Sequence, residues 1–426
     1  MKSQMALRAT QTARGLSGLD RLARHLVASR LDRIRDGTVE IVDADGEWTR
    51  GGGTGALAAT LQVHRARFYR RAVMGGALGI AASYLDGDWD CDDLAHLFRI
   101  FVRNMDGTGR LDGGSARVAT ALNRLWHRAR ANTAPGSRRN IRDHYDLGND
   151  LFRLFLDPSM TYSAGVFESP QATLEDAQFA KLDRICRKLE LAPGHRVLEI
   201  GTGWGSFAIH AARHYGCHVT TTTISEAQYE VAAERVQEAG LGDRITLLRS
   251  DYRDLRGTHD RLVSIEMIEA VGHEYLDTFF RSCSDRLAPD GRMLLQVITT
   301  GDQYYDRYRR SVDFIQRYVF PGSLCPALGA IVASLGRTTD LRITHLEDLT
   351  EDYVQTLRCW RARFLDRVDE VRALGYPDRF VRLWDYYLQY CEAGFAERHV
   401  GDLQLVLDKR LNRDAPIRPQ LATELR

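Results

Sequence analysis

Long apolar runs are missing from the sequence. A helix that crosses a bilayer needs about 20 consecutive apolar residues, and the longest uncharged candidate, residues 72–85, is broken by glycines and bounded by Arg71 and Asp86. The first fifteen residues, MKSQMALRATQTARG, also lack the continuous apolar core of a secretory signal. We therefore expect no transmembrane helix and a cytoplasmic location.

Paired cysteines and metal-binding motifs are missing as well. The 7 cysteines are scattered without a C-x-x-C pair, which argues against a zinc site and against a disulfide framework. His210 and His214 lie four residues apart, but no glutamate follows His210 as an H-E-x-x-H motif requires. We expect reduced thiols and no bound metal.

Net charge is nearly absent, at +1, but its distribution is uneven. Residues 1–142 hold 23 Lys and Arg against 14 Asp and Glu, a balance of +9 that leaves −8 for the remainder. A basic segment suits anionic phospholipid head groups or nucleic acid, and each Lys or Arg near a charged membrane contributes roughly 1 kcal/mol. A plain solvated surface is the alternative.

The organisation of the chain changes after its first third. Residues 1–130 have mainly helical spacing, with one alternating stretch, TVEIVDADGEW, that is typical of a strand hairpin. From residue 178 onward strand-like and helix-like stretches alternate, as in a mostly parallel sheet with helices on both faces. We predict an α/β protein with three parts: a basic N-terminal membrane-docking domain (1–130), a linker and helical cover (131–177), and a sheet domain (178–426) with a lid insertion at about 300–335.

A glycine-rich turn joins the first strand of the predicted sheet to a helix and reads LEIGTGWGS, residues 198–206. Such a turn lets the backbone approach a ligand closely. A dinucleotide site needs G-x-G-x-x-G, whereas this spacing is G-x-G-x-G with an acidic residue two positions upstream, which suits an ammonium group and not a pyrophosphate. The pattern resembles the first motif of class I S-adenosylmethionine methyltransferases. The predicted cofactor contacts of this turn are Glu199, Gly201, Gly203, Trp204 and Gly205.

Further cofactor contacts are expected where the next strands end, because ligands bind at the carboxyl ends of strands in open α/β sheets. Residues after the second strand are placed to line a ribose, and residues after the third to border an adenine. The predicted contacts are Thr223, Ile224 and Gln228 after the second strand, and Tyr252 and Arg253 after the third.

Five longer strings carry a more specific resemblance. They are HYDLGNDLFRLFLDPSMTYSAGVFES (144–169), SIEMIEAVGHEYLDTFF (264–280), YVFPGS (318–323), YYLQYCEAGF (386–395) and GGALGIAASYLDGDWDCDDL (75–94). Together they are similar to the cyclopropane-fatty-acyl-phospholipid synthase family, including its mycolic-acid-modifying relatives. The resemblance covers most of residues 60–410, and it implies a class I methyltransferase fold, a Rossmann-like sheet with helices on both faces, plus a mainly helical N-terminal domain.

The resemblance also implies an activity. Members of this family dock on the inner face of a bilayer as peripheral proteins, draw an unsaturated acyl chain of a phospholipid into an apolar tunnel, and transfer the methyl group of S-adenosylmethionine to its double bond. The attack leaves a carbocation, which aromatic faces stabilise and a base discharges. The family is understood to use bicarbonate as that base, held by a Glu, a His, a Tyr and backbone groups. Relatives also suggest a homodimer.

Carried over to this sequence, the base-holding positions are only partly filled. Glu269 and Tyr353 match the glutamate and the tyrosine, and Ile298 matches the position that offers its backbone. The histidine position is Gln296, and the cysteine of the family's YSC string is Ala164. An amide holds an anion by hydrogen bonding but takes up no proton near neutral pH.

Three more positions follow from the resemblance. Tyr162 and Ser163, which neighbour the cofactor in relatives, are retained. Cys391 matches a cysteine that family descriptions single out, and we interpret it as packing near the site, because an alkene attacks the cofactor without an enzyme nucleophile. The run Phe314, Tyr318 and Phe320 has two readings, as the lining of an acyl tunnel or as ordinary core.

The predicted product is a cyclopropane fatty acyl phospholipid, formed when a base held by Glu269 removes a proton from the new methyl group. Proton loss from a chain carbon would instead leave a methyl-branched or methylene-bearing chain, and Gln296 and Ala164 keep that alternative open. A methyltransferase for soluble metabolites or RNA is a further alternative, but no N/D-P-P-Y/F motif is present, and no nucleic-acid partner is expected. A catalytically silent lipid-binding relative is the last alternative, and the retained Glu269 and Tyr353 argue against it.

Overall fold

The computed structural model describes residues 16–52, 56–105 and 148–417. By their contacts they belong to two compact units, the first taken from residues up to 122 together with 378–386 and the second from the rest. The boundary predicted near residue 130 lies outside the described residues. Within these residues, no helix combines the length and the apolar character needed to cross a membrane.

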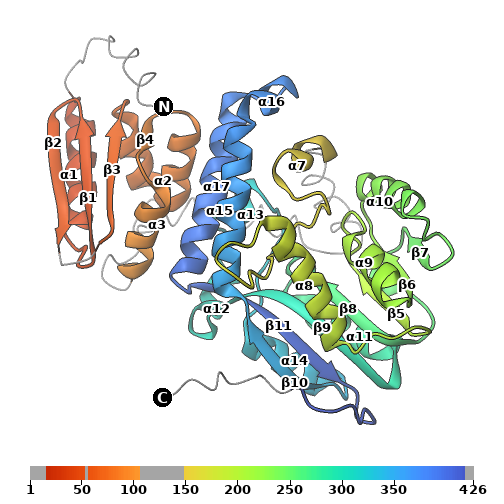
Figure 1. Ribbon diagram of the computed structural model, residues 1–426. Coiled ribbons are helices and arrows are strands. Elements are labelled where there is room, and N and C mark those ends of the chain that lie inside the picture. The colour runs from red at the N-terminus through yellow and green to blue at the C-terminus, as the bar shows by residue number, and fades with distance from the viewer. Residues whose placement is uncertain (1–15, 53–55, 106–147, 418–426) are drawn as a thin grey trace, which may run out of the picture. The chain divides into compact units, whose positions relative to one another are not determined.

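The first unit contains a four-stranded sheet in the order β2-β1-β3-β4 (Figure 1). The predicted hairpin is confirmed: β1 and β2 pair antiparallel, with Asp43 opposite Gly46 at the turn. β3 pairs parallel to β1 and antiparallel to β4, so the unit holds more strand than its sequence predicts. The strands are β1 (Gly37–Asp43), β2 (Gly46–Gly52), β3 (Ala58–Val63) and β4 (Trp89–Cys91).

The helices of the first unit are α1 (Gly18–Leu31), α2 (Arg67–Leu85) and α3 (Leu94–Arg103). Side-chain caps begin two of them, because Ser17 accepts from the backbone N–H of Asp20 and Asp93 from that of His96. The first turns of α17 (Asp378–Ala396) belong here as well. Arg382 explains this, since it donates to Asp90 Oδ1 (2.6 Å) and its guanidinium lies 3.9 Å from the centroid of the Tyr84 ring.

The second unit is built on a seven-stranded sheet in the order β10-β11-β9-β8-β5-β6-β7. The strands from β5 to β9 pair parallel, and β11 runs antiparallel between β9 and β10. This confirms the predicted mostly parallel sheet. The strands are β5 (Arg196–Ile200), β6 (His218–Thr222), β7 (Ile245–Leu248), β8 (His259–Ile265), β9 (Leu287–Thr300), β10 (Arg342–Asp348) and β11 (Val400–Asp408).

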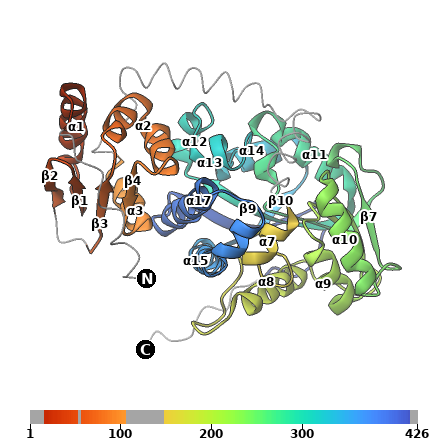
Figure 2. The ribbon, with the colours of Figure 1, turned by 90° about the horizontal axis from the view of Figure 1, so that it is seen from above.

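Helices cover both faces of this sheet, as predicted (Figure 2). Neighbouring residues of one strand point to opposite faces, so Val197 joins the core under α8 and α9 while Leu198 joins the core under α11 and α14. Leu294 and Leu295 of β9 divide in the same way. The helices are α8 (Leu174–Lys188), α9 (Ser206–Tyr215), α10 (Glu226–Glu238), α11 (Leu276–Arg286) and α14 (Leu328–Thr338).

The remaining helices lie outside the alternating strand-helix pattern. The predicted insertion contains α12 and α13 and the start of α14, between β9 and β10. Another group of helices, α7 and α15, packs together, and α15 also contacts β11. These helices are α7 (Asn149–Phe155), α12 (Asp302–Tyr308), α13 (Phe314–Tyr318), α15 (Thr350–Asp366) and α16 (Val368–Ala373).

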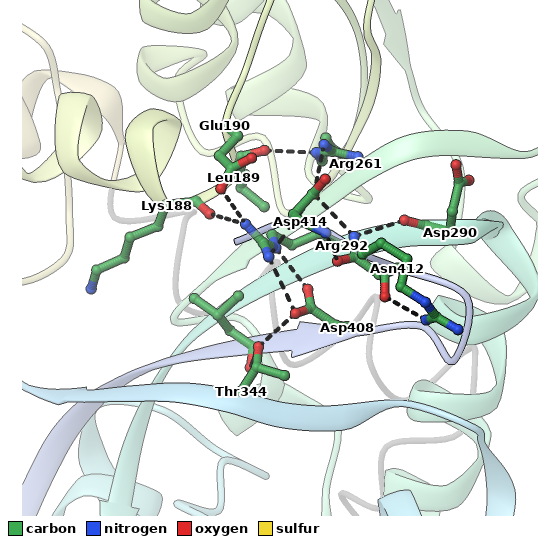
Figure 3. Close-up of polar contacts among 12 residues, drawn as sticks. Lys188, Leu189, Glu190, Arg261, Asp290, Arg292, Thr344, Asp408, Asn412 and Asp414 are labelled. Carbon is green, nitrogen blue, oxygen red and sulfur yellow. Dashed lines mark hydrogen bonds and ion pairs between the residues drawn. The ribbon is translucent and has the colours of Figure 1, made fainter. Parts of the chain in front are cut away.

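A buried polar cluster secures the amino ends of β8 and β9 (Figure 3). Arg292 is 1% exposed, and its guanidinium donates to both carboxylate oxygens of Asp408 (2.6 and 3.2 Å) and to Glu190 Oε1 (3.0 Å). Arg261 donates to the Leu189 carbonyl (2.6 Å) and to Asp414 Oδ2 (3.2 Å). The cluster therefore ties α8, the sheet and the segment after β11 together, and it leaves the carboxyl ends of the parallel strands available for a site.

Candidate active site

The carboxyl ends of β5 and β8 lie side by side where the strand order reverses. β5 pairs with β6 on one side and with β8 on the other. Ligands of open α/β sheets bind outside the carboxyl ends of the strands at such a point. The glycine turn follows β5, and Glu266 and Glu269 follow β8.

The glycine turn has the backbone geometry that its sequence predicts. The backbone N–H groups of Gly201 and Thr202 both donate to the carbonyl of Thr222 (3.1 Å each). Gly201, Gly203 and Gly205 have φ values of 103°, 53° and 87°, in the region that favours glycine. A Cβ at Gly201 would lie 3.1 Å from Cγ of Met267. The turn therefore needs glycine both for its dihedral angles and for close packing.

Glu199 stands at the end of β5, just before this turn. It is 2% exposed, and its Oε2 has no hydrogen-bond partner in the part of the chain that the structure describes. Burial raises the pKa of its carboxyl to about 8. A buried carboxylate oxygen without a partner is costly unless a ligand pairs with it, so this atom fits a ligand that carries an ammonium group.

The residues predicted to line a ribose begin α10. Thr223 Oγ1 donates to Gln228 Oε1 (3.1 Å) and accepts from the backbone N–H of Ser225 (3.1 Å). Ser225 in turn caps the helix by accepting from the N–H of Gln228 (3.3 Å). Thr223 and Gln228 are buried and Ile224 is half-buried. The structure places this group at the same sheet edge as the glycine turn, and its contact with ribose stays a prediction.

The residues predicted to border the adenine form a rigid group after β7. Arg253 makes a two-point ion pair with the buried Asp251, with nitrogen–oxygen distances of 2.7 and 2.6 Å. Its guanidinium lies 5.3 Å from the centroid of the Tyr252 ring. The guanidinium of Arg253 is thus oriented by Asp251, while Tyr252 remains half-buried.

The segment before α8 contributes a cover to the site. Trp204 of the glycine turn is 1% exposed, donates through Nε1 to Asn149 Oδ1 on α7 (2.8 Å) and packs on Phe152 with ring centroids 5.0 Å apart. Tyr162 shares a hydrogen bond with Tyr387 through their hydroxyls (2.8 Å). The indole of Trp204 is therefore a packing group that joins the turn to α7.

Glu266 is the acceptor for three converging donors. The backbone N–H of Ala164 and Nε2 of Gln296 both donate to its Oε1 at 2.9 Å, and the hydroxyl of Tyr353 donates to its Oε2 at 2.7 Å. Burial raises the pKa of this carboxyl, while these donors and the nearby Lys181 oppose the rise. Glu266 itself remains partly exposed. It is a carboxylate held in one orientation by donors on both of its oxygens.

Gln296 connects this carboxylate to a second buried one. Its Nε2 donates to Glu266 Oε1 and to Asp402 Oδ2 (2.8 Å), and its Oε1 accepts from Gln404 Nε2 (3.1 Å). A neutral imidazole has only one N–H, whereas an amide offers two without carrying a charge. The amide is therefore matched to a position between two carboxylates.

Glu269 has different partners. Its Oε1 accepts from the backbone N–H of Ile298 (2.6 Å), and its buried Oε2 has no partner among the described residues. Burial, and then repulsion from Glu266, raise the pKa of Glu269 to about 8. The predicted base-holding residues thus fall into two groups: Ile298 binds Glu269, while Tyr353 and Gln296 bind Glu266.

Lys181 on α8 supplies the positive charge of the site. Its side chain is buried, and Nζ donates to Ser163 Oγ (2.6 Å). Burial lowers its pKa to about 8, against the attraction of carboxylates that include Glu266, Asp402 and Glu199. Ser163, predicted to neighbour the cofactor, therefore also orients the buried ammonium group.

Aromatic side chains surround these carboxyl groups. The ring of Tyr353 stacks on Phe395 with centroids 4.3 Å apart, and Tyr162 lies 5.2 Å from Trp360. Phe320 lies 6.1 Å from the ring of Tyr387. Phe314 is 4% exposed and packs on Tyr318 and Tyr390 as a core residue. Cys391 follows Tyr387 by one turn of α17, and burial raises the pKa of its thiol, which disfavours the reactive thiolate.

Three residues of the site were missed by sequence reasoning: Glu266, Asp402 and Lys181. Glu266 had one detectable signal, because a second acidic residue precedes Glu269 by three positions at the end of a strand. Asp402 and Lys181 lie inside a strand and a helix that read as ordinary packing elements. Only their burial in the folded chain shows their part in the site.

Comparison with known proteins decides the family. A family model described as mycolic acid cyclopropane synthetase matches residues 133–405. The chain belongs to this family. Among curated relatives of the chain, a tuberculostearic acid methyltransferase of Mycobacterium tuberculosis is 37% identical over 87% of each chain. A cyclopropane-fatty-acyl-phospholipid synthase of Escherichia coli strain K12 is 36% identical over 83% of this chain and 89% of its own.

Solved structures agree with the cyclopropane synthetase assignment. The mycolic acid cyclopropane synthase CmaA1, complexed with SAH and CTAB, matches with a TM-score of 0.60 and 30% identity over 64% of this chain and 98% of its own. The cyclopropane synthase MmaA2 of Mycobacterium tuberculosis matches with a TM-score of 0.60 and 31% identity over the same shares. The chain is thus an S-adenosylmethionine-dependent methyltransferase with the class I fold.

The residues present fit S-adenosylmethionine. The glycine turn leaves its backbone open to a ligand, and the partnerless Oε2 of Glu199 is placed for the ammonium of the methionyl part. We expect Glu199 with Gly201 and Gly203 to hold that part, and the groups after β6 and β7 to hold the nucleoside.

Proposed function

We propose that this protein transfers the methyl group of S-adenosylmethionine to the double bond of an unsaturated fatty acyl chain of a phospholipid. The observation that carries the proposal is the position of the aromatic and carboxylate cluster, at the carboxyl end of β8 beside the cofactor turn at the end of β5. A relative named as a cyclopropane-fatty-acyl-phospholipid synthase, 36% identical over most of the chain, supports the substrate class.

The chemistry of the cluster matches an alkene substrate. Bound S-adenosylmethionine would supply a methyl group on a positively charged sulfur, and an isolated alkene is a weak nucleophile with no proton to lose before it attacks. The protein must therefore provide proximity and a site without water. The rings of Tyr162 and Tyr353 both pack against Trp360, and Tyr387 shares a hydrogen bond with Tyr162. We propose that faces of these rings stabilise a cation on the chain. The carboxylates beyond them stabilise the same charge and can accept a proton.

Two products are compatible with this step. A proton taken from the new methyl group closes a cyclopropane ring, the outcome that the family resemblance predicts. A methyl-branched alkene forms when the proton is taken from a chain carbon next to the cation. A methylene-bearing chain forms when a hydride first shifts along the chain, so that the cation lies on the carbon bearing the methyl group, which then loses the proton. One observation favours this second candidate: the amide of Gln296 stands at the imidazole position and is engaged by Glu266 and Asp402, so the groups that receive the proton are arranged differently from the family pattern.

Membrane docking, the second part of the proposal, depends on charge outside the described residues. Within residues 16–105, 12 Lys and Arg balance 12 Asp and Glu. The arginines that open α2 are paired: Arg67 with Asp88 at 2.7 Å, Arg71 with Asp86 at 2.7 Å and Arg70 with Asp20 at 2.8 Å. The excess of +9 in the first 142 residues therefore lies in 1–15 and 106–142. We propose that these segments attract anionic lipid on the inner face of the membrane.

A turnover assay tests the proposal. Purified protein, S-adenosylmethionine and vesicles of an unsaturated phospholipid should give lipid with one added carbon, detected by mass spectrometry, and saturated vesicles are the control. NMR of the product separates ring protons from methylene protons. Methyl transfer that is indifferent to vesicles would contradict the lipid substrate. Vesicle binding that is equally strong at low and high salt would contradict electrostatic docking.

A further inference from the structure

The hydrogen-bond donors that would hold bicarbonate are occupied by the carboxylate of Glu266. The resemblance assigns the holding of bicarbonate to the positions of Tyr353 and Gln296, among others. In this structure both side chains donate to the carboxylate of Glu266, and the backbone N–H of Ala164 is the third donor. A carboxylate and a bicarbonate are both planar anions with two equivalent oxygens, so Glu266 satisfies these donors in the same way. The residues present do not fit a bound bicarbonate.

We propose that the carboxylate of Glu266 replaces bicarbonate and is itself the base that accepts the proton released after methyl transfer. This inference rests on the proposed function. It makes the base a covalent part of the chain, so the reaction needs no dissolved bicarbonate. It also moves the base from a group held by Glu269, as the resemblance implies, to the neighbouring carboxylate of Glu266 after β8.

The proton step balances in charge and electrons. After methyl transfer the acyl chain carries one positive charge. For the ring, a C–H bond of the transferred methyl group breaks and its electron pair forms the new C–C bond to the cationic carbon. For an alkene, a C–H bond on a chain carbon next to the cationic carbon breaks and its electron pair forms the second C–C bond. In both cases the proton binds Glu266. The negative carboxylate and the cation thus become a neutral acid and a neutral lipid. Oε2 of Glu266 is the better acceptor, because it receives one hydrogen bond from Tyr353 while Oε1 receives two.

The surroundings favour the ionised form of Glu266 over that of Glu269. Backbone and amide N–H groups can only donate, so the Ala164 and Gln296 contacts require an acceptor oxygen on Glu266. Glu269 accepts from the backbone N–H of Ile298, and burial, together with repulsion by Glu266, raises its pKa to about 8. We therefore place the negative charge of the pair on Glu266, which accepts three hydrogen bonds, and the proton on Glu269. The raised pKa of Glu266 also makes it a stronger base near neutrality.

The backbone at position 266 allows a clean test. Glu266 has a φ of 46°, in the left-handed region that glycine adopts without strain, and its N–H is held by the carbonyl of Gln296 (2.9 Å). The change Glu266→Gly should therefore fold normally while it frees the three donors and opens room for a small anion. The change Glu266→Gln keeps the shape but removes the basic oxygen. Glu274→Gln, at an exposed position on the same segment, is the matched control.

The first measurement is binding of ¹³C-labelled bicarbonate by saturation-transfer NMR, which needs no turnover. We expect no binding to the wild-type protein and to Glu274→Gln, and clear binding to Glu266→Gly. Bicarbonate binding to the wild-type protein that Glu266→Gly leaves unchanged would overturn the proposal.

The second measurement is turnover of unsaturated vesicles in buffer freed of carbon dioxide, with and without added bicarbonate. The wild-type protein should be equally active in both. Glu266→Gln should lose roughly 10²- to 10⁴-fold in both, the usual contribution of a general base, and Glu266→Gly should recover activity only when bicarbonate is added. A wild-type protein that depends on bicarbonate would overturn the inference. A wild-type protein that methylates no lipid would overturn the proposed function instead. The binding measurement needs no turnover and would then test by itself whether Glu266 takes the place of bicarbonate.

Discussion

At the scale of single residues, Glu199 couples cofactor binding to pH. Its carboxyl has a pKa raised to about 8 by burial, so without ligand it is protonated at neutral pH. Pairing with an ammonium group favours the ionised form, and binding below pH 8 must therefore release a proton. The ordinary pKa lies near 4.5, so the buried group also makes the unliganded fold less stable as pH rises from about 5 to 8.

The expected outcome is proton release on S-adenosylmethionine binding near pH 7, which the change Glu199→Gln abolishes together with at least a tenfold loss of affinity. Calorimetry in buffers of different ionisation enthalpy measures the released proton. Titration of the ligand's own amino group is common to both proteins, so the difference between them isolates Glu199. Equal proton release by the variant would show that another group titrates.

Lys181 sets the charge of the whole carboxylate cluster. Its attraction lowers the pKa of Glu266 and of Glu199, against the effect of burial. The change Lys181→Met should raise both, so the acidic limb of the pH–rate profile moves to higher pH and turnover at pH 7 falls several-fold. Arg187→Met, on an exposed side chain of the same helix, should leave the profile in place. A lower rate with an unshifted profile would indicate a structural role only.

At the scale of elements, the turn between β5 and α9 places unequal demands on its glycines. Gly201 has a φ of 103°, and a Cβ there would lie only 3.1 Å from Met267 Cγ, whereas Gly203 has a φ of 53° and no atom of the described residues lies within 4 Å of the position that its Cβ would take. We expect Gly201→Ala to lower both thermal stability and cofactor affinity markedly, and Gly203→Ala to cost only about 1 kcal/mol. Thermal unfolding with and without S-adenosylmethionine measures both, and equal effects would contradict the packing against Met267.

The same elements show how far sequence reasoning reached. The glycine turn and the parallel strands were predicted correctly because each depends on the local spacing of residues in the sequence. The donors around Glu266 were not, because they come from positions 164, 296 and 353, and only the folded sheet brings them together. The resemblance marked Tyr353 and Gln296 as base-holding positions but gave no indication that a carboxylate of the chain would accept their hydrogen bonds.

At the scale of the whole molecule, the two ends of the parallel strands have different roles. The carboxyl ends carry buried carboxyl groups, as on Glu199 and Glu269, each with an oxygen that has no partner among the described residues, and such oxygens cost stability until a ligand pairs with them. The amino ends carry a closed network in which Arg292 meets Asp408 and Glu190 (Figure 3). The rigid end anchors α8, and α8 in turn carries Lys181 into the site.

Substitution of Arg292 should therefore lower stability and activity more than its distance from the active site suggests. Arg292→Met leaves Asp408 buried with Thr344 as its remaining side-chain donor in the described structure, and breaking a buried ion pair costs about 3–5 kcal/mol. We expect a fall of several degrees in the unfolding midpoint, measured by calorimetry. The exposed Arg256→Met is the control and should unfold like the wild type. Arg292 holds α8 through the Lys188 carbonyl and Glu190. As temperature rises, methyl transfer by Arg292→Met should therefore fall before global unfolding begins. Activity that follows the folded fraction alone would show that the two ends of the sheet are independent.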